Sequence, residues 1–208
     1  AVSVGGLNIL LDATSSIGRS NFQTEDINDD GCVNHKDVLI EPINIEQVDL
    51  PTAQFRATSD LGEIHINERT GSLRTNFIVA ESDKFVSVSA DSIVGIGSAG
   101  SHISGGSISL NAKGGDIDAI SGPLRTDMSD SYSDKFNATA TGSINLSEIS
   151  GDLRADTLVS ASGDVSVTVE AGSFVDANDN NVINIETYEQ LLGSWEALEL
   201  RDEDDGVV

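Results

Sequence analysis

The sequence predicts an all-β fold, a parallel β-solenoid in the form of a right-handed β-helix, with a short C-terminal helix. Apolar residues alternate with polar ones through most of the 208 residues, turn sequences separate the alternating runs, and several runs resemble one another. Alternation with a period of two places every second side chain on one face of a strand. Strands that are too short to bury such a face alone must stack on similar strands.

The alternating runs predict short strands joined by turns rich in Gly, Ser and Asp. In chain order, the expected strands cover residues 7–11, 63–66, 73–80, 85–90, 107–110, 116–120, 143–146, 153–159 and 165–169. An insertion around residues 21–60 and a polar loop over 126–136 interrupt the pattern. We therefore expect a solenoid over residues 1–184 that carries an insertion around 21–60.

Three strand-turn-strand segments are related to one another. GEIHINERTGSLRTN begins at Gly62 and aligns without a gap with GSINLSEISGDLRAD, which begins at Gly142, while the shortened GDIDAISGPLRTD begins at Gly115. An antiparallel β-sandwich is the alternative fold, and it would need hairpin turns such as Asp-Gly between strands. The Asp-Gly pairs, at 30–31 and 205–206, lie outside the repeats, which favours the solenoid.

The apolar spacing becomes helical after residue 184. We expect an amphipathic helix over 185–200 that covers the open end of the strand stack, followed by an acidic tail or linker over 201–208. The apolar face of this helix would consist of Tyr188, Leu191, Leu192, Trp195 and Leu198.

The composition narrows the range of partners. The chain has 35 acidic and 11 basic residues and a formal net charge of -24. This charge repels phosphate backbones and anionic lipids, so we expect no nucleic-acid partner, and divalent cations are the natural counter-ions. No segment approaches the roughly 20 apolar residues of a membrane span, so we expect no membrane insertion. The chain begins at Ala1, and we expect an excerpt of a longer polypeptide rather than a mature chain whose leader was removed.

The segment DINDDGCVNHKD, residues 26–37, has the ligand spacing of a calcium loop. Positions 1, 3, 5, 7, 9 and 12 of such a loop supply oxygen ligands, and position 6 is a glycine at which the chain turns. Gly31 fills position 6, and the segment resembles a dockerin-type or EF-hand-type loop. Because Pro42 follows closely, we expect a structural calcium staple and not a sensor. The predicted ligands are Asp26, Asn28, Asp30, the backbone carbonyl of Cys32, Asn34 and Asp37.

A degraded copy of this loop, DANDNNVINIET, covers residues 176–187. Asn181 replaces the glycine, and Thr187 offers no carboxylate at position 12, so Glu186 or Glu189 would have to supply one. An ordinary acidic surface turn is the alternative interpretation. The ligands of this second site would be Asp176, Asn178, Asn180, the backbone carbonyl of Val182, Asn184 and Glu186.

The repeats resemble those of very large secreted bacterial proteins of the filamentous-haemagglutinin and giant-adhesin kind. The resemblance rests on SGDLRADTLVSASGDVSVTVEAGSFVDAN, GSISLNAKGGDIDAISG and LNILLDATSSIG, and it covers most of residues 60–176 and, more weakly, the first 20 residues. It implies a right-handed β-helix, export to the cell surface or medium, and adhesive, cell–cell or matrix-building roles. No residue of the family's motif is catalytic, so we expect no enzymatic activity.

Arginines and histidines bear on the enzymatic alternative, a carbohydrate-active β-helix enzyme. Arg74, Arg125 and Arg154 each follow a Gly-x-Leu motif and would line one face of a polysaccharide lyase. We prefer the hypothesis that these arginines offset acidic neighbours such as Asp127 and Asp156. The histidines, His35, His65 and His102, have no zinc-site spacing.

The sequence thus predicts a calcium-stabilised structural or adhesive module of a large secreted or cell-surface bacterial protein. The expected partners are neighbouring repeats of the same polypeptide or other copies of the chain, together with cell-surface carbohydrate or protein. A self-assembling extracellular filament or sheath subunit is a further alternative.

Overall fold

The computed structural model describes residues 3–22, 38–97, 102–129 and 131–177, which belong to one compact unit. The first predicted calcium loop, most of the second one, the predicted helix over 185–200 and the acidic tail lie outside the described residues. Nineteen strands account for the regular structure of the described residues, and no helix occurs among them. The chain is all-β, as the alternation predicts.

The strands form two parallel sheets and one small antiparallel pair. The pair joins β3 (Arg19–Phe22) to β4 (Val38–Glu41). Sheet A has 8 strands, which are β1 (Ser3–Gly6), β5 (Ile43–Gln47), β7 (Ile64–Glu68), β9 (Val86–Ala90), β12 (Ile108–Ala112), β15 (Phe136–Ala140), β17 (Leu153–Ser160) and β19 (Phe174–Asp176). Sheet B has 9 strands, which are β2 (Asn8–Ala13), β6 (Gln54–Ser59), β8 (Ser72–Ala80), β10 (Ser92–Gly95), β11 (Ile103–Gly105), β13 (Ile117–Ala119), β14 (Leu124–Met128), β16 (Ile144–Glu148) and β18 (Val165–Val169).

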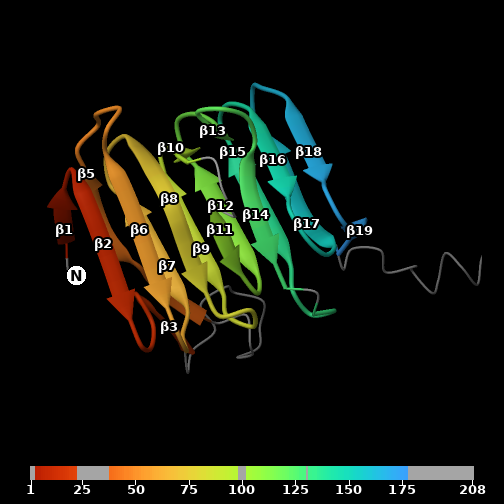
Figure 1. The fold of residues 1–208 in the computed structure, drawn as a ribbon, viewed down its shortest axis with the longest axis horizontal. Helices are drawn as coiled ribbons and strands as arrows, with labels where there is room; N and C mark the ends of the chain where they lie inside the picture. The colour runs from red at the N-terminus through yellow and green to blue at the C-terminus, as the bar shows by residue number, and fades with distance from the viewer. Residues whose placement is uncertain (1–2, 23–37, 98–101, 130, 178–208) are drawn as a thin grey trace, which may run out of the picture. The chain divides into compact units, whose positions relative to one another are not determined.

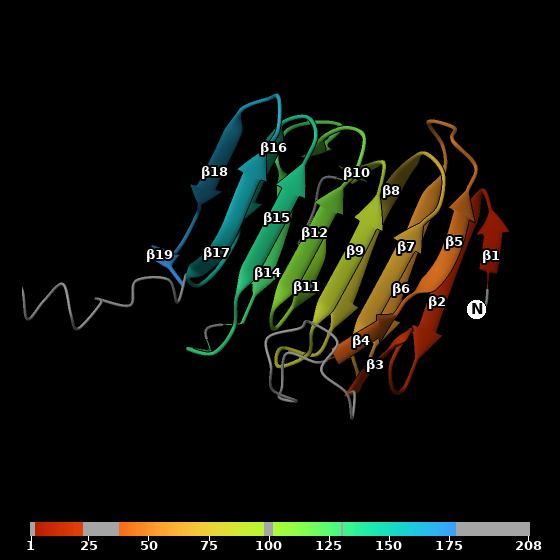
Figure 2. The ribbon, with the colours of Figure 1, turned by 180° about the vertical axis from the view of Figure 1, so that it is seen from behind.

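The chain winds between the two sheets as a right-handed coil of about six turns. Strands β2, β6 and β8 of sheet B run downward in Figure 1, and strands β5, β7 and β9 of sheet A run upward behind them, as Figure 2 shows from the other side. Since the coils advance from left to right in Figure 1, this sense of winding is right-handed, which is the usual hand of parallel crossovers. The predicted parallel solenoid is confirmed, and the antiparallel sandwich is wrong.

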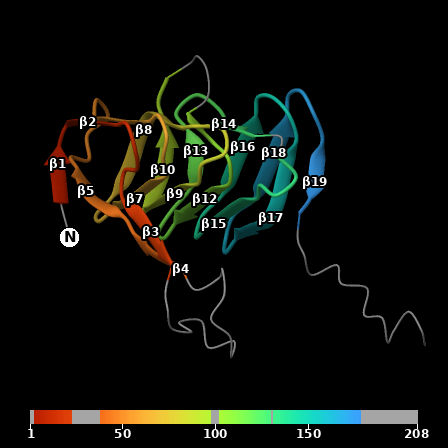
Figure 3. The ribbon, with the colours of Figure 1, turned by 90° about the horizontal axis from the view of Figure 1, so that it is seen from below.

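The core lies between the sheets and consists of inward rows of side chains, one from each coil. In sheet A, Ile64, Val86, Ile108 and Phe136 are successive partners along the ladder, and each of these side chains is fully buried. The two sheets form the two layers seen from below in Figure 3, and between them one branched or aromatic side chain from each strand fills a place in the row. Burial of each such side chain stabilises the fold by roughly 1.5–3 kcal/mol.

The repeated segments occupy different sheets although their sequences align. The segment from Gly62 places its first strand, β7, in sheet A, whereas the segments from Gly115 and Gly142 place theirs, β13 and β16, in sheet B. Alternation and a glycine turn specify a strand followed by a corner, and both sheets of the solenoid accept that unit. The sequence repeat therefore does not correspond to a fixed position in the coil.

The insertion predicted around residues 21–60 also contains β5 and β6, which pair with the neighbouring coils of sheets A and B. Within the described residues, the chain leaves the two main sheets between Gly18 and Pro42. This narrower excursion carries the first predicted calcium loop.

Candidate functional site

The predicted calcium ligands fall almost entirely outside the described residues. Asp26, Asn28, Asp30, Cys32, Asn34 and Asp37 lie outside them, as do all the ligands of the second site except Asp176, which ends β19. Among residues 3–22, 38–97, 102–129 and 131–177, no group of three or more His, Cys, Asp or Glu residues could hold a metal ion. Both calcium sites stay predictions.

The structure does show what flanks the first predicted loop. Strands β3 and β4 pair in antiparallel fashion from Arg19 with Glu41 to Phe22 with Val38, so the two ends of segment 23–37 are held side by side. We call the pair β3–β4 the stem. A loop whose ends are already fixed loses less chain entropy when an ion orders it.

We use the word rung for one strand of the ladder of a sheet. One rung of sheet A is interrupted, and the stem leaves the sheet at this interruption. Ile17 pairs with Ile64 just before the stem, and Ile43 pairs with Ile66 just after it. Two backbone hydrogen bonds hold Ile17, the part of the rung before the stem. Ile17 N donates to Glu63 O at 2.9 Å, and His65 N donates to Ile17 O at 2.7 Å. Ile17 and β5 thus form a single rung that the stem divides, which we call the split rung.

Gly18 allows the chain to turn out of the split rung. Its φ of 75° lies in the left-handed region, which side chains with a Cβ rarely adopt. A Cβ at this position would lie 2.9 Å from both the Cβ and the carbonyl oxygen of His65 and 3.1 Å from the carbonyl oxygen of Glu41. The backbone therefore passes directly over His65, and only glycine fits.

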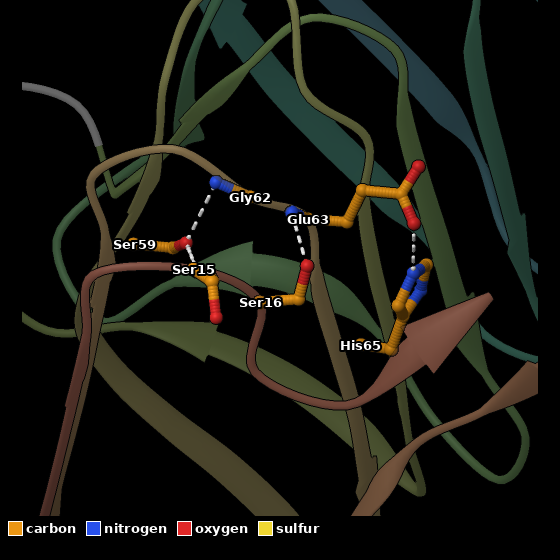
Figure 4. A network of polar contacts seen from close by, with 6 residues as sticks. All are labelled: Ser15, Ser16, Ser59, Gly62, Glu63 and His65. Atoms are coloured by element: carbon orange, nitrogen blue, oxygen red, sulfur yellow. Dashed lines mark hydrogen bonds and ion pairs between the residues drawn. The ribbon is translucent and has the colours of Figure 1, made fainter.

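A small network of polar contacts ties the segment before the stem to the turn of the next coil (Figure 4). The Ser59 hydroxyl donates to the carbonyl oxygen of Ser15 and accepts from the backbone N–H of Gly62 at 3.2 Å. The Ser16 hydroxyl accepts from the backbone N–H of Glu63, also at 3.2 Å. These contacts fix the chain on the approach to the split rung.

His65 lies on the outer side of sheet A, yet its side chain is fully buried. Its Nε2 lies 2.9 Å from Glu63 Oε2, and its ring meets the edge of Phe85 with the centroids 5.5 Å apart. Because Gly18 passes close to the Cβ and the carbonyl oxygen of His65, His65 lies directly beneath the point at which the stem leaves sheet A. Sequence reasoning classed His65 as a scattered histidine and missed this role, since burial on the outer face arises only from the insertion.

Beyond the stem, the outer face of sheet A carries two rows of small uncharged polar side chains. Neighbouring strands are about 4.8 Å apart, and residues i and i+2 of a strand about 6.6–6.8 Å, so the rows form a regular array. We call it the polar face. The rows consist of Ser87, Ser109, Asn137 and Thr157, and of Asn44, Asn67, Ser89, Asn111 and Thr139.

Much of the hydrogen-bonding capacity of the polar face is unused. Asn67 donates to Asn44 Oδ1 at 2.7 Å and accepts from Lys113 Nζ at 2.9 Å, and the Thr139 hydroxyl donates to Asn111 Oδ1 at 3.3 Å. The hydroxyls of Ser87, Ser89 and Ser109 form no hydrogen bond to any described residue, and each is only half-buried. The three serine hydroxyls therefore offer a regular array of hydrogen-bond donors and acceptors to the solvent.

The three repeat arginines do not line one face. Arg74, Arg125 and Arg154 lie on β8, β14 and β17 and pair with Val94, Ser147 and Val175 of different rows. Of the acidic neighbours expected to offset their charge, one lies beside Arg125, although among the described residues none of the three forms an ion pair with Asp127 or Asp156. Instead, Arg74 donates to the Pro51 carbonyl at 3.1 Å, Arg125 lies 3.7 Å from Glu170 and Arg154 stacks on Tyr132 at 4.6 Å.

Two buried glutamates act as acceptors inside the solenoid. The Glu68 carboxylate accepts from the backbone N–H groups of Gln47 at 2.8 Å and Thr70 at 3.2 Å, and burial raises the pKa of this carboxyl. The Glu148 carboxylate accepts from the Thr126 hydroxyl at 2.6 Å and from the backbone N–H of Met128 at 2.8 Å. Both glutamates end the first strand of an aligned repeat, at an inward position. A carboxylate at that shared inward position is the sequence signal from which both acceptors could have been found.

Comparisons with known proteins give no relative for this chain. No protein-family model matches it, and neither the curated proteins nor the solved structures contain a match. Among the described residues, no helix is long and apolar enough to cross a membrane.

Proposed function

We propose that this chain is a structural and adhesive module of a large secreted or cell-surface bacterial protein, stabilised by calcium bound at residues 26–37. The observation that supports the adhesive part is the polar face, because it offers the same kind of contact at every rung. Many weak contacts at regular spacing add up when the partner is extended, such as cell-surface carbohydrate or protein. The stacked coils supply a rigid support for this array.

The split rung supports the calcium part of the proposal. An ion bound at residues 26–37 would close the loop that joins Phe22 to Val38, whose backbones already pair. The stem leaves the sheet through Gly18, directly above the buried His65. Order in the loop would therefore be transmitted to a packed part of sheet A. Such an ion would act as a staple, since it stabilises a stem and moves no helix.

Thermal unfolding with calcium and with chelator tests the staple. We expect calcium at 100 times its Kd to stabilise the wild type by about 2.7 kcal/mol and to raise its Tm. The variant Asp26→Ala/Asp30→Ala should lose this rise. The matched control Glu81→Ala/Asp83→Ala removes two exposed carboxylates from a turn outside the stem and should keep it. Identical melting curves of the wild type in calcium and in chelator would contradict the calcium part.

The adhesive part has its own test. Beads coated with the chain should agglutinate erythrocytes, and Ser87→Lys/Ser109→Lys should weaken agglutination severalfold by placing long cations within the polar face. Ser104→Lys/Thr168→Lys adds the same charge to the outer side of sheet B and should have no effect. Adhesion that is absent from the wild type, or equal in both variants, would contradict this part of the proposal.

A further inference from the structure

A second candidate site lies on the outer side of sheet B, at the starts of β2 and β6 and beside the middle of β8. Two hollows adjoin there, of about 260 Å³ and about 130 Å³, and Gln54 lines both. Asn8, Leu10 and Arg56 line the larger hollow, and Asn76, Ile96 and Gly97 the smaller one. We call the two hollows together the arginine groove.

Arg56 is held in place by neutral groups. Its Nη2 donates to Gln54 Oε1 at 3.2 Å, and its guanidinium lies 5.6 Å from the centre of the Phe77 ring. In the amide orientation that satisfies both of its groups, Asn76 accepts from Arg56 Nη2 at 2.9 Å and Nε at 3.1 Å and donates to the Ile96 carbonyl at 3.1 Å. The guanidinium is thus oriented before any ligand arrives, which lowers the entropy cost of binding.

The charge of Arg56 is not neutralised by the described residues. No described carboxylate lies within ion-pair distance of it, although the chain has 35 acidic residues. The exposed Arg69, in contrast, pairs with Glu46 at 3.0 Å. Asp12, on the neighbouring strand β2, accepts from the Thr58 hydroxyl at 2.7 Å. Arg56 is thus an oriented cation whose printed contacts are with amide oxygens and an aromatic ring.

We propose that the arginine groove binds the carboxylate of an acidic sugar residue, such as a uronate within an oligosaccharide. Because the Gln54 and Asn76 oxygens occupy Nη2 and Nε, a ligand carboxylate would accept a charge-assisted hydrogen bond from the N–H groups of Nη1. The amides of Asn8, Gln54 and Asn76 provide donors and acceptors for sugar hydroxyls, and Leu10 and Ile96 provide apolar contact for the C–H faces of the ring. Because the net charge is -24, the groove suits a sparsely charged chain better than a dense polyanion.

Titration calorimetry with a matched ligand pair tests the groove. The probes are a tetrasaccharide that contains glucuronate and the same tetrasaccharide with its carboxyl groups reduced to alcohols. We expect the acidic form to bind at least tenfold more tightly than the neutral form. Equal affinity for the two forms, no binding of either form, or displacement of the acidic form by equimolar sulfate would overturn the proposal.

Variants locate the binding. Arg56→Gln should weaken binding of the acidic form at least tenfold, and Arg56→Lys should have a smaller effect because it keeps the charge but loses the planar group that Gln54 and Asn76 orient. Asn76→Asp keeps Arg56 and supplies an internal carboxylate beside it, so it should also abolish the preference for the acidic form. Arg69→Gln, outside the groove, should bind like the wild type. Unchanged affinity in both Arg56→Gln and Asn76→Asp would overturn the assignment to this groove.

The proposals for the arginine groove and for the polar face can be contradicted independently of each other. The groove lies on sheet B and the polar face on sheet A, and the stem adjoins sheet A. Loss of sugar binding in Arg56→Gln should leave agglutination through the polar face and the calcium-dependent Tm unchanged. The inference therefore goes beyond the proposed function and does not depend on it.

Discussion

The split rung and the regular rungs of sheet A fill the same inward positions of the core, but the chain follows a different path in each. In β9, β12 and β15 one continuous strand supplies the whole rung. In the split rung, Ile17 fills one inward position and β5 fills the following ones, with the stem between them. Ile17 is nevertheless almost as well buried as Ile108, which pairs in a regular rung.

The difference shows what a solenoid requires of an insertion. The segments before and after the insertion must both still pair with the next coil. Unpaired backbone groups and an unfilled place in a core row would lower the stability of the fold. The split rung meets this requirement with a glycine corner at Gly18 and with an acceptor on the neighbouring strand β7, where Glu68 accepts from the backbone N–H of Gln47 at the end of β5. The corresponding strands β9, β12 and β15 end on alanine. The stem can then carry a loop without loosening the stack.

The largest expected effect compares inward positions of the two kinds of rung. Ile108→Ala should destabilise the protein by about 2–5 kcal/mol, because it leaves a cavity in a packed row. If the split rung is as well packed as a regular one, Ile17→Ala should cost a similar amount. Urea unfolding followed by circular dichroism measures both changes. A loss of unfolding free energy well under 1 kcal/mol for Ile17→Ala would show that the part of the split rung before the stem contributes little to the core.

The next effect concerns the corner of the split rung. Gly18→Ala should destabilise by more than the roughly 1–2 kcal/mol of left-handed strain alone, because the new Cβ also collides with His65. Gly71→Ala is the matched control, since its φ is 89° but its nearest neighbour would be at an ordinary 3.8 Å. The difference between the two melting temperatures measures the collision. Equal losses would mean that the backbone over His65 has room to move.

Glu68 should give a smaller, pH-dependent effect. Glu68→Gln at neutral pH leaves one of the two backbone N–H groups, of Gln47 or Thr70, without its carboxylate acceptor and should cost about 1–3 kcal/mol. Burial raises the pKa of this carboxyl in the folded state, so protonation favours folding. The contribution of Glu68 is thus greatest below its unfolded pKa near 4.5 and is lost as the pH rises through its folded pKa.

The measurement is the unfolding free energy of both proteins between pH 4 and pH 7. We expect the stability difference between wild type and Glu68→Gln to shrink as the pH rises across that window. Glu148→Gln is the companion variant at the equivalent position of the other repeat. A stability difference for Glu68→Gln that grows with pH would contradict the assigned direction of the shift.

The smallest expected effect is on the polar face. Asn67→Ala removes the hydrogen bond to Asn44, which joins the split rung to β7 on the solvent side, and the exposed bond that Asn67 Oδ1 accepts from Lys113 Nζ at 2.9 Å. We expect a loss of about 0.5–1.5 kcal/mol. Asn111→Ala removes the corresponding contact to Thr139 between regular rungs and should cost the same or less. A markedly larger loss in Asn67→Ala would indicate that the split rung depends on its outer contacts.

Much of the solenoid was predictable, because alternation is a local property. Strands such as β8, β9 and β17 lie close to their predicted ranges, since each presents apolar side chains at every second residue and ends at a turn. Strands β5 and β6 were missed because Pro42 and Pro51 adjoin them and the calcium-like segment precedes them, which made residues 21–60 look like one insertion. The parallel arrangement was predictable because the repeats lacked hairpin turns.

Of the three candidate sites, one was predictable from the sequence and two were found only in the structure. The ligand spacing in residues 26–37 is a local pattern, so the sequence alone supplied the calcium hypothesis. The polar face and the arginine groove depend on which strands become neighbours. Arg56 meets Asn76 because β6 pairs with β8, and no spacing along the chain announces that contact.

The sequence by itself determined that the chain forms short strands with one apolar face and must stack them, because alternation and glycine turns act within a few residues. Only the tertiary structure decided which sheet each repeat joins, since a strand followed by a corner fits either sheet. It also decided that Ile17 and β5 share one rung around a stem, and that Arg56 faces amides and not carboxylates. These outcomes depend on register between distant segments, which the energy of the whole packed stack selects.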